Sequence, residues 1–142
     1  MSEILFQNRT FTRAPQQRLQ TILSNLENLR LWDTEITQVT VAGNGVDITR
    51  QVPALNLHEH LTVTTSSNQV IYHSQGGRLA YQLTFTLSGD DTQTVLTEAL
   101  SVPTSAGLLV PLKLVAPIAK QAFAQKLATL ITLAESDWVV ND

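Results

Sequence analysis

The chain has 142 residues, of which 43% are hydrophobic and 15% charged, a composition typical of one globular domain with a core of its own. The net charge is -3 and lysine and arginine do not cluster, so we expect no nucleic-acid partner. The absence of cysteine excludes disulfides, thiolate nucleophiles and cysteine-ligated metal sites.

These observations, together with an N-terminus that lacks the basic-then-apolar order of a signal peptide, predict a single domain over residues 1–142 with a cytoplasmic location. The longest apolar run, 106–119, contains Lys113 and two prolines and is shorter than the ~20 residues that span a bilayer. We therefore expect no membrane anchor.

The elements change type along the chain. Residues 3–13 have the phenylalanine and threonine content of a strand, which Ala14 and Pro15 end. Residues 15–24 and 26–31 have apolar side chains at helical spacing and predict two short helices, closed by Trp32 in the core. From 36 to 102 the pattern has period two and is broken by five groups of turn residues, which predicts six strands joined as a meander.

A long amphipathic helix is predicted over residues 117–135. At 100° per residue one face carries the apolar stripe Ala119, Phe123, Leu127, Leu130 and Ala134, and the opposite face carries Gln121, Gln125, Ala128 and Thr132. We expect this apolar face of the helix to be buried against a sheet.

The turns set the register of the meander. A two-residue turn at Gly76–Gly77 would place Tyr72 opposite Tyr81 and Val70 opposite Leu83 on one face. Four-residue loops at 89–92, 66–69 and 53–56, with a turn at Gly43–Asn44, extend this face to the other strands. The predicted inner face then includes Val46, Ile48, Arg50, Glu59, Leu61, Val63, Val70, Tyr72, Tyr81, Leu83, Phe85, Leu96, Glu98, Leu100 and Val102.

Three ionisable residues lie on this otherwise apolar face. Arg50 lies directly opposite Glu59, a pair that is either structural or faces a ligand. Glu98 falls beside Leu83 with no lysine or arginine near it, so its pKa should be raised. Either Glu98 meets a hydrated cavity, or the register is one residue off and it faces solvent.

The three histidines give no metal site in this register. His58, His60 and His73 all project from the outer face, with no acidic residue or cysteine placed to complete a coordination sphere. No nucleophile turn or glycine-rich phosphate loop occurs, and we expect no cofactor.

The order of elements carries a resemblance to a known superfamily. The segment ENLRLWD after the first helix, the Gly76–Gly77 hairpin followed by RLAYQLTFTL, and the closing helix together resemble the START-like, helix-grip (SRPBCC) proteins, which include polyketide cyclase/dehydrase-like and lipid-transport-like members. The resemblance covers nearly the whole chain and implies an α+β fold. In that fold a seven-stranded antiparallel sheet wraps around the C-terminal helix and leaves a cavity for apolar compounds.

Three functions follow from this reading. The preferred one is binding or carriage of a small hydrophobic molecule in a cavity between sheet and helix, unless sheet side chains fill that space. Its expected lining is Arg50, Glu59, Tyr72, Tyr81, Leu83, Phe85, Glu98, Leu100, Ala119, Phe123 and Leu127. The alternatives are a cyclase/dehydratase-like enzyme with Glu98 as general acid/base beside Tyr72 and Tyr81, and a protein-interaction module or homodimer that uses the apolar segment 106–115.

Overall fold

The computed structural model describes residues 2–90, 92–103 and 112–142. The elements, in chain order, are β1 (Ser2–Thr12), α1 (Gln16–Ser24), the 3-10 turn η1 (Leu26–Asn28), α2 (Leu29–Trp32), β2 (Ile36–Ala42), β3 (Gly45–Arg50), β4 (His58–Thr65), β5 (Gln69–Gln75), β6 (Tyr81–Gly89), β7 (Thr94–Pro103) and α3 (Leu112–Ala134). The strands form one antiparallel sheet in the order β1-β7-β6-β5-β4-β3-β2. The predicted α+β helix-grip architecture is confirmed.

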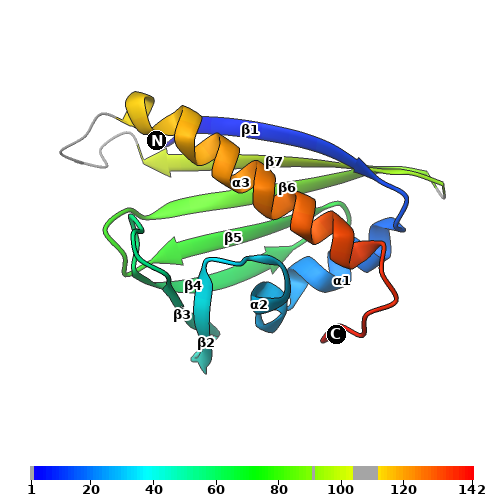
Figure 1. Cartoon of the computed structure of the whole chain (residues 1–142), viewed down its shortest axis with the longest axis horizontal. Helices are drawn as coiled ribbons and strands as arrows, with labels where there is room; N and C mark the ends of the chain where they lie inside the picture. Colours follow the sequence, from blue (N-terminus) through cyan, green and yellow to red (C-terminus); the bar gives the residue numbers. More distant parts are fainter. Residues whose placement is uncertain (1, 91, 104–111) are drawn as a thin grey trace.

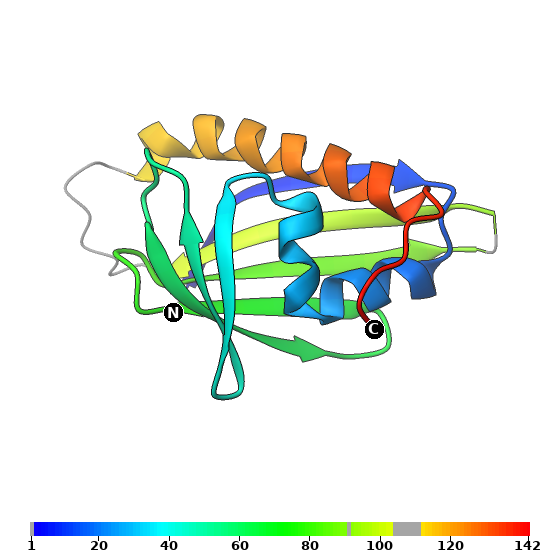
Figure 2. The ribbon, with the colours of Figure 1, turned by 60° about the horizontal axis from the view of Figure 1, so that its bottom comes forward.

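The curled sheet holds α3 against its inner face, and α1 and α2 lie under the C-terminal half of that helix (Figure 1). Figure 2 shows the same layers from below, with β2 and β3 at the opposite edge from β1 and the tip of their hairpin pointing away from α3. The space between the sheet and α3 therefore has two different ends. At one end α1 and α2 pack against the helix, and at the other end they do not.

The helix α3 begins earlier than the sequence indicates. It starts at Leu112, so Pro117 lies inside it rather than at its first position. As the sixth residue of the helix, Pro117 cannot donate the hydrogen bond that an N–H at this position would make to the carbonyl of Lys113, so it weakens the first turns of α3. Its buried face is as predicted, since Leu127, Leu130 and Ala134 are buried and Gln121, Gln125, Ala128 and Thr132 are exposed.

The meander has the predicted inner face, although three of its loops differ from the predicted register. Val41 faces Val46 across the Gly43–Asn44 turn, and Thr65 faces Val70 across the 66–69 loop, both as expected. At the other loops the pairing moves by two residues, so that Tyr72 faces Leu83, Ile48 faces Glu59 and Phe85 faces Glu98. A displacement of two leaves every side chain on the same face of its strand.

An asparagine side chain explains the longer loop at Gly76–Gly77. The side chain of Asn56 pairs with the backbone of Leu79, donating to its carbonyl at 2.7 Å and accepting from its N–H at 2.9 Å. It lies so close to Gly77 that an added Cβ there would be 2.5 Å from the Asn56 Cγ. Residues 76–80 therefore form a loop over Asn56, and the predicted two-residue turn, with Tyr72 directly opposite Tyr81, is wrong.

The core lies where the sheet meets α1, α2 and the C-terminal half of α3. Trp32 is 2% exposed, as predicted, and stands edge-on to Phe85, which in turn packs edge-on against Tyr72 with ring centroids 5.2 Å apart. The Tyr72 hydroxyl donates to the Leu23 carbonyl at 2.6 Å. This end of the sheet is closely packed, and its buried tyrosine is satisfied by backbone.

Candidate ligand cavity

A cavity of about 220 Å³ lies under the N-terminal half of α3. Its walls come from β1, the 53–56 loop, the inner face of the sheet and one side of α3. The lining residues are Leu5, Glu35, Arg50, Pro53, Ala54, Leu55, Asn56, Glu59, Leu79, Tyr81, Leu100, Val115, Ala119, Phe123 and Lys126. Most of these are apolar, and the polar ones gather around Arg50.

The predicted lining residues divide between this cavity and the packed core. Arg50, Glu59, Tyr81, Leu100, Ala119 and Phe123 line the cavity. Tyr72, Leu83, Phe85 and Glu98 are instead buried elsewhere on the inner face of the sheet, and Leu127 is buried on α3, all at 5% exposure or less. The difference follows from α1 and α2, which pack at the far end of the inner face, whereas α3 is the only described helix over the near end.

Arg50 is the centre of a buried polar cluster. Although displaced by two residues from the position opposite Glu59, its guanidinium still donates to Glu59 Oε1 at 2.9 Å, and it also donates to Asp33 Oδ2 at 3.2 Å. Burial opposes the charge of Arg50, but the carboxylates of Glu59 and Asp33 outweigh it and raise its pKa above the ordinary value. The arginine therefore stays charged.

Glu59 has a complete set of hydrogen-bond donors. Its Oε1 accepts from Arg50 and from the Tyr81 hydroxyl at 2.7 Å, while its Oε2 accepts from Asn56 at 2.8 Å and Ser74 at 3.1 Å. Burial, then the neighbouring carboxylate, raise the pKa of Tyr81, which keeps its hydroxyl protonated as a donor. Such a fully bonded carboxylate gives the cavity a rigid polar end.

Lys126 is a member of this cluster that the sequence reading missed. Its side chain is 6% exposed, and its ammonium lies 3.0 Å from Glu35 Oε2, 3.6 Å from Asp33 Oδ2 and 4.4 Å from the centre of the Phe123 ring. The signal was its position beside Leu127 in the buried stripe, three residues after Phe123, where a long side chain can reach the sheet.

Glu98 is on the inner face, as predicted, and is completely buried. Asn8 Nδ2 donates to its Oε1 at 3.2 Å, and its Oε2 has no hydrogen-bond partner among the described residues. Burial raises the pKa of Glu98 from 4.5 to about 7, against the opposing effects of Asn8 and Lys126. The expectation that no cation lies nearby is wrong, because Lys126 reaches inward from α3.

The histidines lie away from the cavity and bond to neighbouring strands. His60 Nδ1 is 2.7 Å from Asp47, His58 pairs with Thr49 and His73 with Thr64. Within residues 2–90, 92–103 and 112–142, no group of three or more metal-ligating side chains is found.

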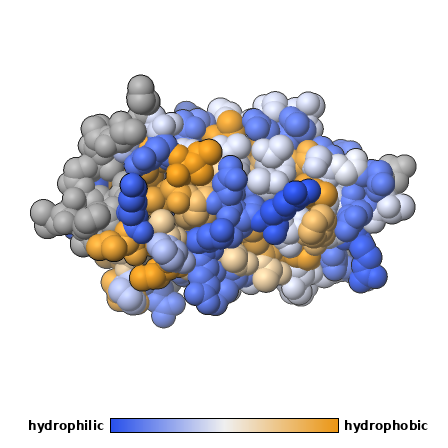
Figure 3. Space-filling model, turned by 90° about the horizontal axis from the view of Figure 1, so that it is seen from above, coloured by the Kyte–Doolittle hydropathy of each residue, from blue (hydrophilic) through white to orange (hydrophobic). Residues whose placement is uncertain are grey.

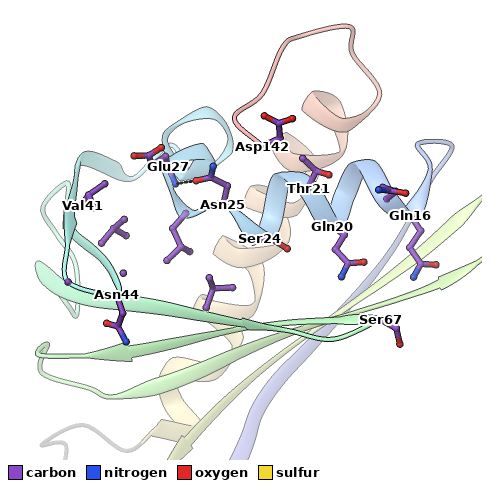
Figure 4. Close-up of a pocket in the computed structure, with 16 residues that line it drawn as sticks. Gln16, Gln20, Thr21, Ser24, Asn25, Glu27, Val41, Asn44, Ser67 and Asp142 are labelled. Atoms are coloured by element: carbon purple, nitrogen blue, oxygen red, sulfur yellow. Dashed lines mark hydrogen bonds between the residues drawn. The ribbon is translucent and has the colours of Figure 1, made fainter.

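A second, larger hollow lies between α1 and the strands that face it, on the side of α1 that carries its glutamines (Figure 4). It has a volume of about 1090 Å³ and is an open groove whose α1 side carries Gln16, Gln20, Thr21 and Ser24, with Asn44 across from them. Leu26, Val41, Val46 and Val63 also line this groove, but its amide and hydroxyl groups are well hydrated, so it gains less from excluding water than a mainly apolar cavity does. The smaller apolar cavity under α3 is the better candidate for a ligand site.

The segment predicted as an interaction surface is only partly described. Residues 106–111 lie outside the described residues, and 112–115 form the first turn of α3. Leu114 and Ile118, one turn apart, are about 70% exposed (69% and 72%). Hydrophobic side chains gather near this end of the molecule in Figure 3. Of the described helices, none has the length and hydropathy required of a membrane span.

Comparison with known proteins gives structural matches only. No family model and no curated protein sequence matches the chain. A START superfamily protein from Mycobacterium smegmatis superposes with a TM-score of 0.77 at 16% identity, covering 92% of this chain and 96% of that one. The chain has the START-like helix-grip fold.

Two further structures share this START-like fold. A norcoclaurine synthase point mutant from Thalictrum flavum, in complex with a transition-state analogue, matches with a TM-score of 0.69 and 13% identity over 94% of both chains. DynU16, encoded in the dynemicin biosynthetic locus, matches with a TM-score of 0.63 and 14% identity, over 92% of this chain but 46% of its own. These identities support the fold and leave the ligand to be argued from the site.

Proposed function

We propose that the protein binds a small, mainly hydrophobic molecule in the cavity under the N-terminal half of α3. The observation that carries the proposal is the lining, in which aliphatic and aromatic side chains from sheet, loop and helix surround a few fixed polar groups. This combination is characteristic of small-molecule sites, where apolar area supplies affinity and polar groups set orientation.

The volume limits the size of the ligand. A cavity of about 150 Å³ accommodates benzene, and sites for drug-sized molecules run from about 300 to 1,000 Å³. At about 220 Å³, the cavity fits a single ring with a short substituent. It is too small for a sterol or a polycyclic polyketide unless α3 moves away from the sheet.

The cyclase-like alternative has less support from the geometry. Glu98 is not among the residues that line the cavity, and the Tyr72 hydroxyl is already bonded to the Leu23 carbonyl. A general acid/base must come within hydrogen-bond reach of the group that it protonates. Binding without catalysis is therefore the function that we propose.

A substitution that fills the cavity tests this proposal. Ala119 lines it, whereas Ala128 is exposed on the opposite face of the same helix, so Ala119→Phe and Ala128→Phe add the same group inside and outside. Binding of benzyl alcohol, followed by NMR chemical-shift titration, should weaken at least about tenfold in Ala119→Phe, because the phenyl group takes the ligand's space. Ala128→Phe should bind as the unmodified protein does.

Two results would count against this function. One is saturable binding of benzyl alcohol that Ala119→Phe leaves unchanged, which would place the ligand elsewhere. The other is no binding of benzyl alcohol or toluene at millimolar concentration, together with no retained small molecule in native mass spectra of the purified protein.

A further inference from the structure

The polar end of the cavity carries an excess of negative charge. Three carboxylates, of Asp33, Glu35 and Glu59, surround the two cations Arg50 and Lys126. When all five groups are ionised, one negative charge is left unbalanced. A ligand that adds another negative charge here meets repulsion, and one that adds a positive charge restores balance.

Glu35 is the member of the cluster with an unused hydrogen-bond acceptor. Both oxygens of Glu59 are fully bonded and its side chain is inaccessible, and the side chain of Asp33 is only 5% exposed. Glu35, in contrast, is 46% exposed, lines the cavity and uses Oε2 for Lys126. Its Oε1 accepts no hydrogen bond from the described residues.

The two cations are already engaged. Arg50 uses both terminal nitrogens on carboxylates, and the ammonium of Lys126 lies between Glu35 and Asp33 with the Phe123 ring beside it. An anionic ligand that approached the Lys126 ammonium would also come close to the carboxylates of Glu35 and Asp33 and would be repelled by them. A donor group can bind Glu35 without breaking any bond in the cluster.

We infer that the cavity selects small apolar molecules with a protonated amine at one end, and that Glu35 is the residue that sets this preference. The inference rests on the proposed function and names the chemical class of its ligand. The apolar body would lie among Leu100, Ala119 and Phe123, with the ammonium donating to Glu35 Oε1.

Three ligands of nearly equal size test the preference. Benzylamine is protonated at pH 7, benzyl alcohol is neutral and benzoate is negative, so the series changes charge while the ring stays the same. We expect benzylamine to bind about two- to fivefold more tightly than benzyl alcohol, the effect of one partly exposed ion pair, and benzoate to bind most weakly. Calorimetry at low and high salt should show the benzylamine advantage shrinking as salt screens it.

The variant Glu35→Gln should bring the affinity of benzylamine down to that of benzyl alcohol, because the amide keeps the shape and loses the charge that favours the ammonium. Glu27→Gln is the matched control, since Glu27 is an exposed glutamate on η1 outside the cavity. It should retain the full preference.

The outcomes separate the two proposals. If benzyl alcohol binds and Ala119→Phe abolishes its binding, the cavity function stands whatever the charge preference. In that case equal affinities for benzylamine and benzyl alcohol, tighter binding of benzoate, or an unchanged preference in Glu35→Gln would overturn the role of Glu35. If none of the three ligands binds, the proposed function fails with it.

Discussion

The buried carboxyl of Glu98 makes a quantitative prediction about stability. Its pKa is raised from 4.5 to about 7, chiefly because burial disfavours the charged form. Each unit of pKa is worth about 1.4 kcal/mol, so ionised Glu98 costs the folded state about 3 kcal/mol relative to the unfolded chain. Glu98→Gln, which removes the charge and keeps the acceptor for Asn8, should recover most of this energy.

The sign of the pH dependence follows from the raised pKa. Between about pH 4.5 and 7 the folded state holds a proton that the unfolded chain has lost, so this group makes the protein less stable as pH rises through that window. Above about pH 7 the full cost is present, and below about pH 4.5 it has disappeared. The Glu98→Gln variant should therefore exceed the unmodified protein by about 2–3 kcal/mol at pH 8 and by little at pH 4.5.

Urea unfolding at the two pH values measures this difference, with the emission of buried Trp32 as one signal. Comparing the variant with the unmodified protein cancels other titrating groups, and Glu3→Gln, at an exposed position, serves as the control. Equal unfolding free energies of the variant and unmodified protein at pH 8, or the same difference at both pH values, would show that Glu98 does not carry a burial cost.

Further predictions concern the residues that hold the cavity and its helix. Phe123→Ala should lower the unfolding free energy by about 2 kcal/mol, since the ring is half-buried against Phe6 with ring centroids 5.1 Å apart. Gln125→Ala, on the exposed face, should change the unfolding free energy by less than about 0.5 kcal/mol. Equal melting temperatures of the two variants would refute the assigned face. Glu59→Leu should cost about 3–5 kcal/mol in urea unfolding because it leaves Arg50 buried beside an apolar group, and a smaller loss than in Phe123→Ala would contradict the structural role of the pair. Arg18→Ala should cost about 1–2 kcal/mol, since Arg18 bonds the carbonyls of Leu133, Ala134, Ser136 and Trp138 at the end of α3; unchanged amide exchange in that last turn would argue against the contact.

Much of the fold was predictable because hydrophobic period alone determines which face of each strand is buried. Turn residues then located the hairpins, and the faces survived even where the register moved by two residues. The register between β5 and β6 depended on Asn56, whose side chain bonds the backbone N–H and carbonyl of Leu79 as a neighbouring strand would. Pairing of this kind joins residues 23 positions apart and leaves no local pattern in the sequence.

The polar part of the site was harder to predict for a related reason. Arg50 and Glu59 could be paired from strand register, and their contact is present. Lys126 lies on α3 and Glu35 in the turn between α2 and β2, far apart in the chain, and they meet only because α3 crosses the curled sheet at this place (Figure 2). A lysine inside an apolar helical stripe is a signal, but its partners depend on that crossing.

The position of the cavity depends on the two short helices more than on the small residues of α3. Ala119 and Ala134 lie on the same stripe of the helix, yet Ala119 lines the cavity and Ala134 is 3% exposed within the core. At the Ala134 end, α1 and α2 fill the space between sheet and helix, and Arg18 of α1 bonds the Ala134 carbonyl. At the Ala119 end α3 is the only helix among the described residues that lies over the sheet, and the charged cluster bonds the polar side chains there instead. A small residue on α3 therefore leaves a hollow only where α1 and α2 are absent, which is why the proposed ligand site lies at the N-terminal half of the helix and the packed core at the other.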